Sequence, residues 1–306
     1  MAVADADDQL AWEERTRPRA AAIAALGGLL GVVGALILYY RVSVSDAPSS
    51  LLLDSLQNLE RPGPIGEQPT ARTATFQYED DNLGFALGWR VMVSLGLLGT
   101  GLVLSYLGTC TRARRPKLAR FALPAPAVGG ALLGASILTL YLAQQQLTGN
   151  VLDGDGTVDA ATQSPSSGDV GSGLLILGSL TFAVGGALVA LNAMRAGLLT
   201  KTMGILGMFA ALSPMLLGPI QFPPLLPLWT IFLVPLLLGR WMGGQPPAWV
   251  TGREEPWPTA AELREERMRA KGKLAEPDPV AVETAARATR EVPHPSSKKR
   301  KRKRRT

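Results

Sequence analysis

The sequence predicts an all-α fold: a polytopic membrane helix bundle of about six transmembrane helices, with both termini cytoplasmic and a disordered basic C-terminal tail. Its apolar runs of roughly 18 to 24 residues can cross a hydrocarbon core of about 30 Å at 1.5 Å per helical residue. The gaps between these runs alternate in charge. The gap 108–121 contains five basic residues and no acid, whereas the gap 144–172 contains four acids and no basic residue. Because basic residues near span ends stay on the cytoplasmic side, this alternation predicts repeated membrane crossing.

The apolar runs define a membrane domain of residues 20–242, preceded by a cytoplasmic segment of residues 1–19. The predicted spans cover residues 20–40, 85–107, 123–143, 173–194, 198–217 and 225–242. The first follows Arg15, Arg17 and Arg19 and ends in Tyr39–Tyr40, a pair that suits the membrane interface. Pro235 predicts a kink in the last span. Six spans place every basic-rich gap and both termini on the cytoplasmic side of a plasma membrane.

Three outer connections join these spans, over residues 41–84, 144–172 and 218–227. In the first, five leucines between 51 and 59 predict a short amphipathic helix on the outer surface. Residues 72–78 alternate between apolar and polar side chains and predict an extended segment. The third connection is uncharged and contains four prolines.

The chain beyond the last span is predicted in two parts. Residues 243–273 form an interfacial segment and a solvated, charged helix, which a capping-box pattern at 259–262 begins. Trp241, Trp249 and Trp257 lie close to the span end, so we expect them in the headgroup layer. Residues 274–306 are rich in Pro, Ala and charge, which predicts disorder.

The tail ends in eight consecutive basic residues. They are Lys298, Lys299, Arg300, Lys301, Arg302, Lys303, Arg304 and Arg305. The chain has 31 basic and 25 acidic residues and a net charge of +6; without this run, 23 basic and 25 acidic residues remain. Eight adjacent cations repel one another and attract an anion. Two partners fit, namely the anionic lipid of the membrane surface and RNA.

Glycines at small-residue spacing occur in several spans. They are Gly27, Gly31, Gly34, Gly130, Gly134, Gly178, Gly185 and Gly186. Lipid offers no hydrophobic drive for helices to associate, so close backbone approach supplies it. Packing inside the bundle explains these glycines, and the alternative is a homo-oligomer that forms through glycine-rich helix faces.

Arg90 is the one basic residue well inside a predicted span, near the outer end of the second. It departs from the positive-inside trend. One interpretation is contact with an anionic headgroup or solute. The other is a structural role, in which the side chain extends to the surface beside Asp80 and Asp81.

The second outer connection contains a weak candidate calcium site. Asp153, Asp155 and Asp159 are spaced like three ligands of an EF-hand or dockerin loop, and Gly156 occupies the sharp-turn position. Val151 and Thr162 stand where two further oxygen ligands are required. The alternative is a flexible acidic turn.

Catalytic patterns are missing from the sequence. The single histidine, His294, lies between two prolines of the predicted disordered tail, and the single cysteine, Cys110, stands at the basic end of a span. One cysteine permits neither an internal disulfide nor a thiolate metal cluster. There is no Walker loop and no H-E-x-x-H motif. We therefore expect neither an enzyme nor a cofactor.

Short motifs in the last three spans and in the segment that follows them carry a resemblance. They are Met194–Thr200, Leu228–Trp229, Gly239–Trp241 and Pro246–Gly252. They resemble the C-terminal half of multi-pass membrane proteins common in high-GC Gram-positive bacteria, a family without an assigned activity or site residues. The resemblance implies a bacterial plasma-membrane location.

The sequence thus favours an integral plasma-membrane protein with a structural or interaction role, whose tail engages anionic lipid or RNA. The alternative is a passive transporter, channel or flippase-like protein. Its path would be lined by Arg90 and by the proline-containing fifth and sixth spans.

Overall fold

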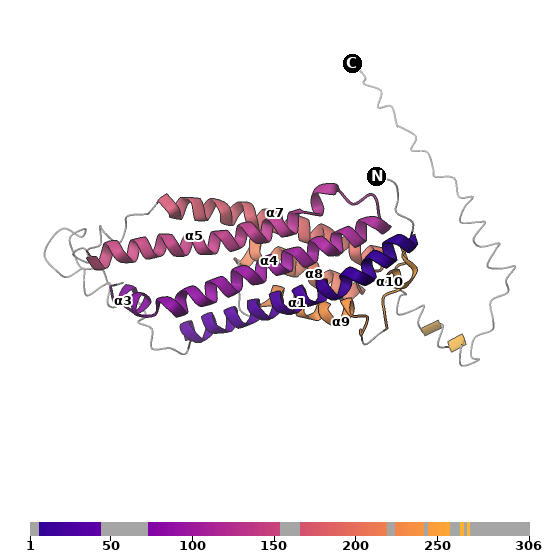
Figure 1. Cartoon of the computed structure of the whole chain (residues 1–306), viewed down its shortest axis with the longest axis horizontal. Helices are drawn as coiled ribbons and strands as arrows, with labels where there is room; N and C mark the ends of the chain where they lie inside the picture. Colours follow the sequence, from indigo (N-terminus) through magenta and orange to yellow (C-terminus); the bar gives the residue numbers. More distant parts are fainter. Residues whose placement is uncertain are drawn as a thin grey trace, which may run out of the picture. The chain divides into compact units, whose positions relative to one another are not determined.

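The computed structural model describes residues 6–43, 73–153, 166–218, 224–241, 244–257, 264–265 and 268–269. The chain divides into two units, Met1–Trp257 and Pro258–Thr306. The described residues form helices and turns and contain no strand (Figure 1), which confirms the all-α prediction. In the second unit, the described residues are helical, and Arg269 Nη2 lies 3.7 Å from Glu265 Oε2. They lie in the predicted charged helix.

The first unit is a bundle of long helices. Its elements are α1 (Ala6–Ser43), α3 (Thr73–Asp81), α4 (Leu83–Arg114), the 3-10 turn η2 (Arg120–Ala122), α5 (Ala125–Asp153), α7 (Ser166–Ala196), α8 (Lys201–Leu217), α9 (Leu225–Leu237) and α10 (Ala248–Thr251). Four of them, α1, α4, α5 and α7, are long and apolar enough to cross a membrane. They correspond to the first four predicted spans, as expected of a polytopic membrane protein.

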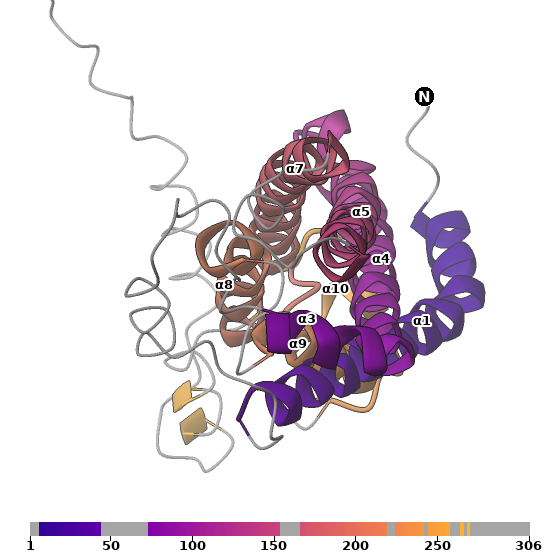
Figure 2. The ribbon, with the colours of Figure 1, turned by 90° about the vertical axis from the view of Figure 1, so that its left-hand side faces the viewer.

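Helix α4 is the central element of the bundle. The neighbouring pairs α1–α4, α4–α5, α5–α7, α7–α8, α8–α9 and α9–α1 form a closed ring of six helices, and α4 also packs against α7 and α9. Figure 2 shows this ring from one end, with α3 lying across that end. We call it the outer end, where α1 finishes and α4 begins. The inner end is where α1 begins, α4 finishes and α10 lies (Figure 1).

Helices α8 and α9 are shorter than the predicted fifth and sixth spans. With 17 and 13 residues, they measure about 25 and 20 Å. Helix α8 begins at Lys201 because the Thr200 hydroxyl caps it, accepting a hydrogen bond from the Met203 N–H. Helix α9 finishes at Leu237, two residues before Gly239, which has a φ of +70°.

Other predicted boundaries also need correction. Helix α1 starts at Ala6, so residues predicted as a separate cytoplasmic segment extend the first long helix by several turns. Residues predicted as an extended segment form the helix α3. Helix α5 continues to Asp153 and α7 starts at Ser166, so both include residues that were predicted to belong to the second connection, 144–172. The predicted amphipathic helix at 51–59 lies outside the described residues.

Glycine contacts hold the long helices close together. A Cβ on Gly99 of α4 would lie 3.0 Å from Gly27 Cα of α1, and a Cβ on Gly129 of α5 would lie 2.4 Å from the Phe182 nitrogen of α7. All eight glycines singled out in the sequence have atoms of another helix of this chain within 4 Å of such a Cβ. These close contacts supply the dispersion energy that holds helices together in lipid.

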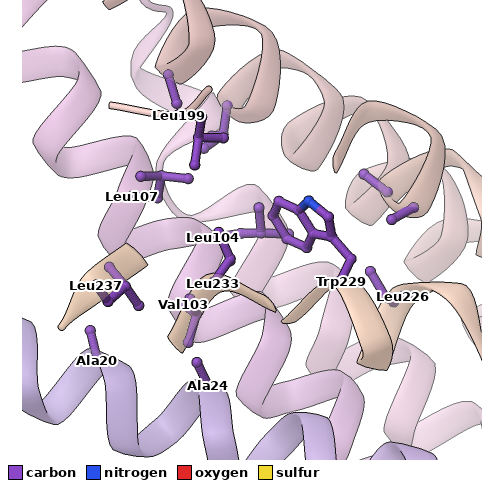
Figure 3. Close-up of a cluster of buried hydrophobic side chains, with 14 of the residues drawn as sticks. Ala20, Ala24, Val103, Leu104, Leu107, Leu199, Leu226, Trp229, Leu233 and Leu237 are labelled. Carbon is purple, nitrogen blue, oxygen red and sulfur yellow. The ribbon is translucent and has the colours of Figure 1, made fainter. Parts of the chain in front are cut away.

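The inner half of the bundle is filled by large apolar side chains around Trp229 (Figure 3). Trp229 of α9 is 1% exposed, and its indole N–H donates to the Met203 carbonyl oxygen at 3.0 Å. A Cβ on Gly207 would lie 2.5 Å from the Trp229 ring, so this glycine makes room for it. Leu104 of α4 and Leu233 of α9 complete the contact and are almost fully buried.

The glycine contacts predict a sharp difference between two Gly→Ala substitutions. Gly129→Ala forces α5 and α7 apart and should cost about 1–3 kcal/mol in the free energy of unfolding in detergent. Gly88→Ala on α4 meets no atom within 4 Å and gains helix propensity, so it should be neutral or stabilising. Equal stability of the two variants would contradict the packing described above.

Candidate polar sites at the two ends of the bundle

The four buried charged residues of the described chain, Glu13, Glu79, Arg90 and Arg114, belong to two clusters. The inner cluster consists of Glu13, Arg17, Arg114, Ala248 and Trp249. The outer cluster consists of Arg41, Glu79, Trp89, Arg90, Tyr141 and Gln144.

Arg114, at the end of α4, is the centre of the inner cluster. Its Nη1 and Nη2 donate to the two Glu13 carboxylate oxygens at 2.5 and 2.8 Å. Its Nε and Nη2 donate to the Ala248 carbonyl oxygen at 3.0 and 2.8 Å, and its Nη1 donates to the Cys110 carbonyl oxygen at 3.0 Å. All five N–H donors of the guanidinium therefore have an acceptor. The side chains of Glu13 and Arg114 are both 0% exposed.

The helices bring this pair together because each residue continues a buried face. On α4, Val103, Leu107, Cys110 and Arg114 follow one another at spacings of four, three and four. On α1, Glu13 lies seven residues before the buried Ala20, hence on the same face two turns earlier. The pair thus joins the first turns of α1 to the last turn of α4. The cluster was missed in the sequence because Glu13 resembles a solvated acid and Arg114 one of five similar cations.

Trp249 attaches the segment after α9 to the same cluster. It is 2% exposed, and its indole N–H donates to the Leu198 carbonyl oxygen at 3.0 Å. The guanidinium carbon of Arg17 lies 4.3 Å from the Trp249 ring centroid, a cation–π distance. Nearby, Gly197 has a φ of +81°, and a Cβ there would overlap the Glu255 carbonyl oxygen. Trp249 is thus enclosed by the bundle, which the sequence did not predict.

In the outer cluster, a chain of hydrogen bonds links four helices. Arg41 of α1 donates to Glu79 Oε1 of α3 at 2.6 Å, and Gln144 Nε2 of α5 donates to Glu79 Oε2. Arg90 Nη2 of α4 donates to the Gln144 amide oxygen at 3.3 Å. Helix α3 is thereby fixed to α1 and α5. The sequence did not single out Glu79, because it is the first of three consecutive acids. The other two, Asp80 and Asp81, are exposed.

Arg90 is 8% exposed and held between two aromatic rings. Its guanidinium carbon lies 4.5 Å from the ring centroids of both Trp89 and Tyr141. Its Nη1 donates to the Ala86 carbonyl oxygen at 2.8 Å. The side chain thus lies inside the bundle at its outer end, and its described contacts do not include α8 or α9.

The remaining candidate residues give no further site. Asp153 is the last residue of α5, and Asp155 and Asp159 lie outside the described residues, as do the eight basic residues 298–305. Within the described ranges, no group of three His, Cys, Asp or Glu side chains is placed to hold a metal ion. Cys110 is fully buried beside the inner cluster.

Comparisons of the chain with protein-family models, with curated proteins and with solved structures found no match. The function proposed below therefore depends on the geometry of the two clusters.

The inner cluster predicts a large cost for separating its ion pair. Glu13→Gln leaves the Arg114 charge buried without a carboxylate and should lower the free energy of unfolding by about 3–5 kcal/mol. The same change at the exposed neighbour Glu14 should have an effect within about 0.5 kcal/mol. Thermal and denaturant unfolding in detergent measure both variants. A Glu13→Gln protein as stable as Glu14→Gln would contradict the assignment.

Proposed function

We propose that this chain is an integral plasma-membrane protein with six crossings and both termini in the cytoplasm. It acts as a structural or interaction protein, and its basic tail binds the anionic lipid of the inner leaflet. The observation that carries this proposal is the distribution of buried charge: within the described chain it is confined to the two ends of the bundle.

The packed interior favours a scaffold over a passive pathway. Between the two clusters, buried hydroxyl groups are bonded within the bundle: Ser94 donates to the Gly134 carbonyl oxygen, and the hydroxyls of Thr100 and Thr230 lie 3.1 Å apart. Glycine contacts and the side chains around Trp229 pack beside them and leave a small, mostly apolar cavity of about 30 Å³ next to Thr100, which Gly31 and Pro227 help to line. A conducting path lined by Arg90 and by the proline-containing helices α8 and α9 would require Arg90 to lie beside these two helices. The described contacts of Arg90 are instead with α4 and α5.

The inner cluster supports the proposed topology independently of the charge pattern. It joins Glu13 of α1 to Ala248, which follows the last apolar helix. The two ends of the membrane domain thus meet on one side, as an even number of crossings requires. The basic residues of the gap 108–121 lie at the same end, which favours the cytoplasm for it.

Helices α8 and α9 are the proposed fifth and sixth crossings. They are apolar but short of a hydrocarbon thickness of about 30 Å. Local thinning of the bilayer and packing against longer neighbours accommodate such a mismatch. Lys201 and Arg240 flank the pair at the proposed cytoplasmic side, whereas the connection 218–227 is uncharged.

The tail's attachment to a membrane protein favours lipid over RNA as its partner. Anionic headgroups of the inner leaflet are present at high effective concentration beside the tethered tail. Each basic residue near such a surface contributes about 1 kcal/mol. Arg114 and Trp249 hold residues 248–249 against the bundle, so the first unit finishes at its inner end, the proposed cytoplasmic side.

The resemblance to membrane proteins of high-GC Gram-positive bacteria supports a bacterial plasma membrane as the location. Its motif residues include Gly197, Leu198 and Trp249, which make the contacts at the inner end described above. The motif thus has a packing role in this chain, and it adds no chemistry.

The topology predicts the accessibility of single cysteines. Because Cys110 is fully buried, the cysteines are introduced at exposed positions in a Cys110→Ala background. In intact cells, an impermeant maleimide should label Asp169→Cys and Leu217→Cys, whereas Arg253→Cys should react only after permeabilisation. Labelling of Arg253→Cys from outside would reverse the orientation. Protection of Leu217→Cys on both sides would leave four crossings in place of six.

The tail predicts salt-sensitive binding to anionic membranes. Replacing residues 298–305 by eight glutamines should abolish binding of the solubilised protein to phosphatidylglycerol vesicles, and several hundred millimolar salt should release the wild-type protein. The matched control replaces the acids Asp5, Asp7 and Asp8 by asparagine and should bind as the wild type does. Unchanged binding of the glutamine variant would exclude lipid as the tail's partner. Co-purification of RNA that depends on residues 298–305 would favour the alternative.

A further inference from the structure

Arg90 is a buried cation without a carboxylate partner in the described part of the chain. Its hydrogen bonds within the described chain go to two neutral oxygens, of Ala86 and Gln144. These bonds use two of its five N–H groups. Burying a charge is costly unless an opposite charge and hydrogen bonds compensate it.

The nearby acid Glu79 does not supply this compensation directly. Its Oε1 accepts from Arg41 and its Oε2 accepts from Gln144. Gln144 therefore stands between the carboxylate and Arg90, donating to one and accepting from the other. Both oxygens of Glu79 are already engaged, and the guanidinium of Arg90 keeps three N–H groups for another acceptor.

Three buried polar atoms of α4 and α5 have no hydrogen-bond partner in the described part of the chain. The first is the indole nitrogen of Trp89, a residue that is 4% exposed and whose ring lies 4.5 Å from the Arg90 guanidinium carbon. The others are Gln145 Nε2 and Thr148 Oγ1, in the turns of α5 that follow Tyr141. Buried polar groups in native proteins are almost always satisfied. Two of these three are obligate donors, so what is missing is an acceptor.

We infer that the outer cluster binds a phosphate group, with Arg90 and the Trp89 indole N–H as its principal donors. A phosphate supplies both the negative charge that Arg90 lacks and acceptor oxygens for the unpartnered donors. A guanidinium matches its oxygens in two parallel hydrogen bonds. The site lies at the outer end of apolar helices, at the depth of lipid headgroups under the proposed orientation. The phosphate comes either from a phospholipid headgroup or from a free anion.

A purely structural cluster makes the opposite prediction for stability without ligand. If Arg90 is complete as it stands, Arg90→Gln removes stabilising contacts and should destabilise the empty protein. If the site awaits an anion, Arg90→Gln removes an uncompensated charge and should leave the empty protein as stable or more stable. The stability of Arg90→Gln without ligand does not depend on the basic tail. A negative result would therefore contradict the phosphate site without contradicting the proposed function of the tail.

The test measures thermal unfolding of the full chain, purified in a phosphate-free maltoside detergent, with and without added ligand. The ligands are inorganic phosphate, phosphatidylglycerol and, as a lipid without phosphate, diacylglycerol. The wild-type unfolding temperature should rise with phosphatidylglycerol or phosphate but not with diacylglycerol. Trp89→Phe keeps the ring and removes the N–H, and should weaken the apparent affinity about tenfold. Arg90→Gln should abolish the shift, and the matched control Trp12→Phe should keep it.

Every variant carries the same tail, so any difference between them reports the outer cluster. A shift with phosphatidylglycerol alone identifies a lipid headgroup, and a shift with inorganic phosphate as well identifies a free-anion site. Equal shifts for Arg90→Gln and the wild type, an undiminished affinity of Trp89→Phe, or an equal response to diacylglycerol would each overturn the proposal. So would the absence of any shift in the wild type. A ligand-free Arg90→Gln protein that is less stable than the wild type, or that fails to fold, would support the structural reading and overturn the proposal; Trp89→Phe tests the donor role without removing a charge.

Discussion

Arg114 is the residue on which the inner end of the bundle depends, because its guanidinium contacts three separate segments at once. It bonds the Glu13 carboxylate of α1, the Cys110 carbonyl of its own helix and the Ala248 carbonyl of the segment after α9. In a buried setting these bonds are strong together and costly to separate, since each partner left alone is an unsatisfied polar group. One side chain thereby joins the start of the helix bundle to the segment that follows its last apolar helix.

The middle of the bundle is held by a different kind of interaction. Small residues let α1, α4, α5 and α7 approach until backbone atoms touch, and Trp229 fills the space that Gly207 leaves. This contact is short-ranged and uncharged, so it carries little desolvation cost in an apolar environment. Buried charge in the described chain is thus found at the two ends, where it joins separate segments. Each end also has a buried donor without a hydrogen-bond partner in the described chain, Arg17 Nε in the inner cluster and Trp89 Nε1 in the outer one.

The sequence predicted the helical class, the four long helices and the importance of small residues, because apolar length and glycine spacing are local signals. It did not predict Glu13, Glu79 or Trp249 as buried residues, since burial of a polar or interfacial side chain depends on partners distant in sequence. Arg114 differs from Arg112 and Arg115 only in the face of α4 on which it lies. That face is defined only if the helix continues to residue 114. The outlines of α8 and α9 depended likewise on the Thr200 cap and on Gly239.

The central claim is that the Glu13–Arg114 pair holds the segment after α9 against the bundle. Hydrogen exchange of residues 244–257 tests it most directly, compared between the wild type and Glu13→Gln in the same detergent. The account predicts protected amides in the wild type that exchange much faster in the variant, while the amides of α7 stay equally protected in both. Equal protection of residues 244–257 in the two proteins would contradict it.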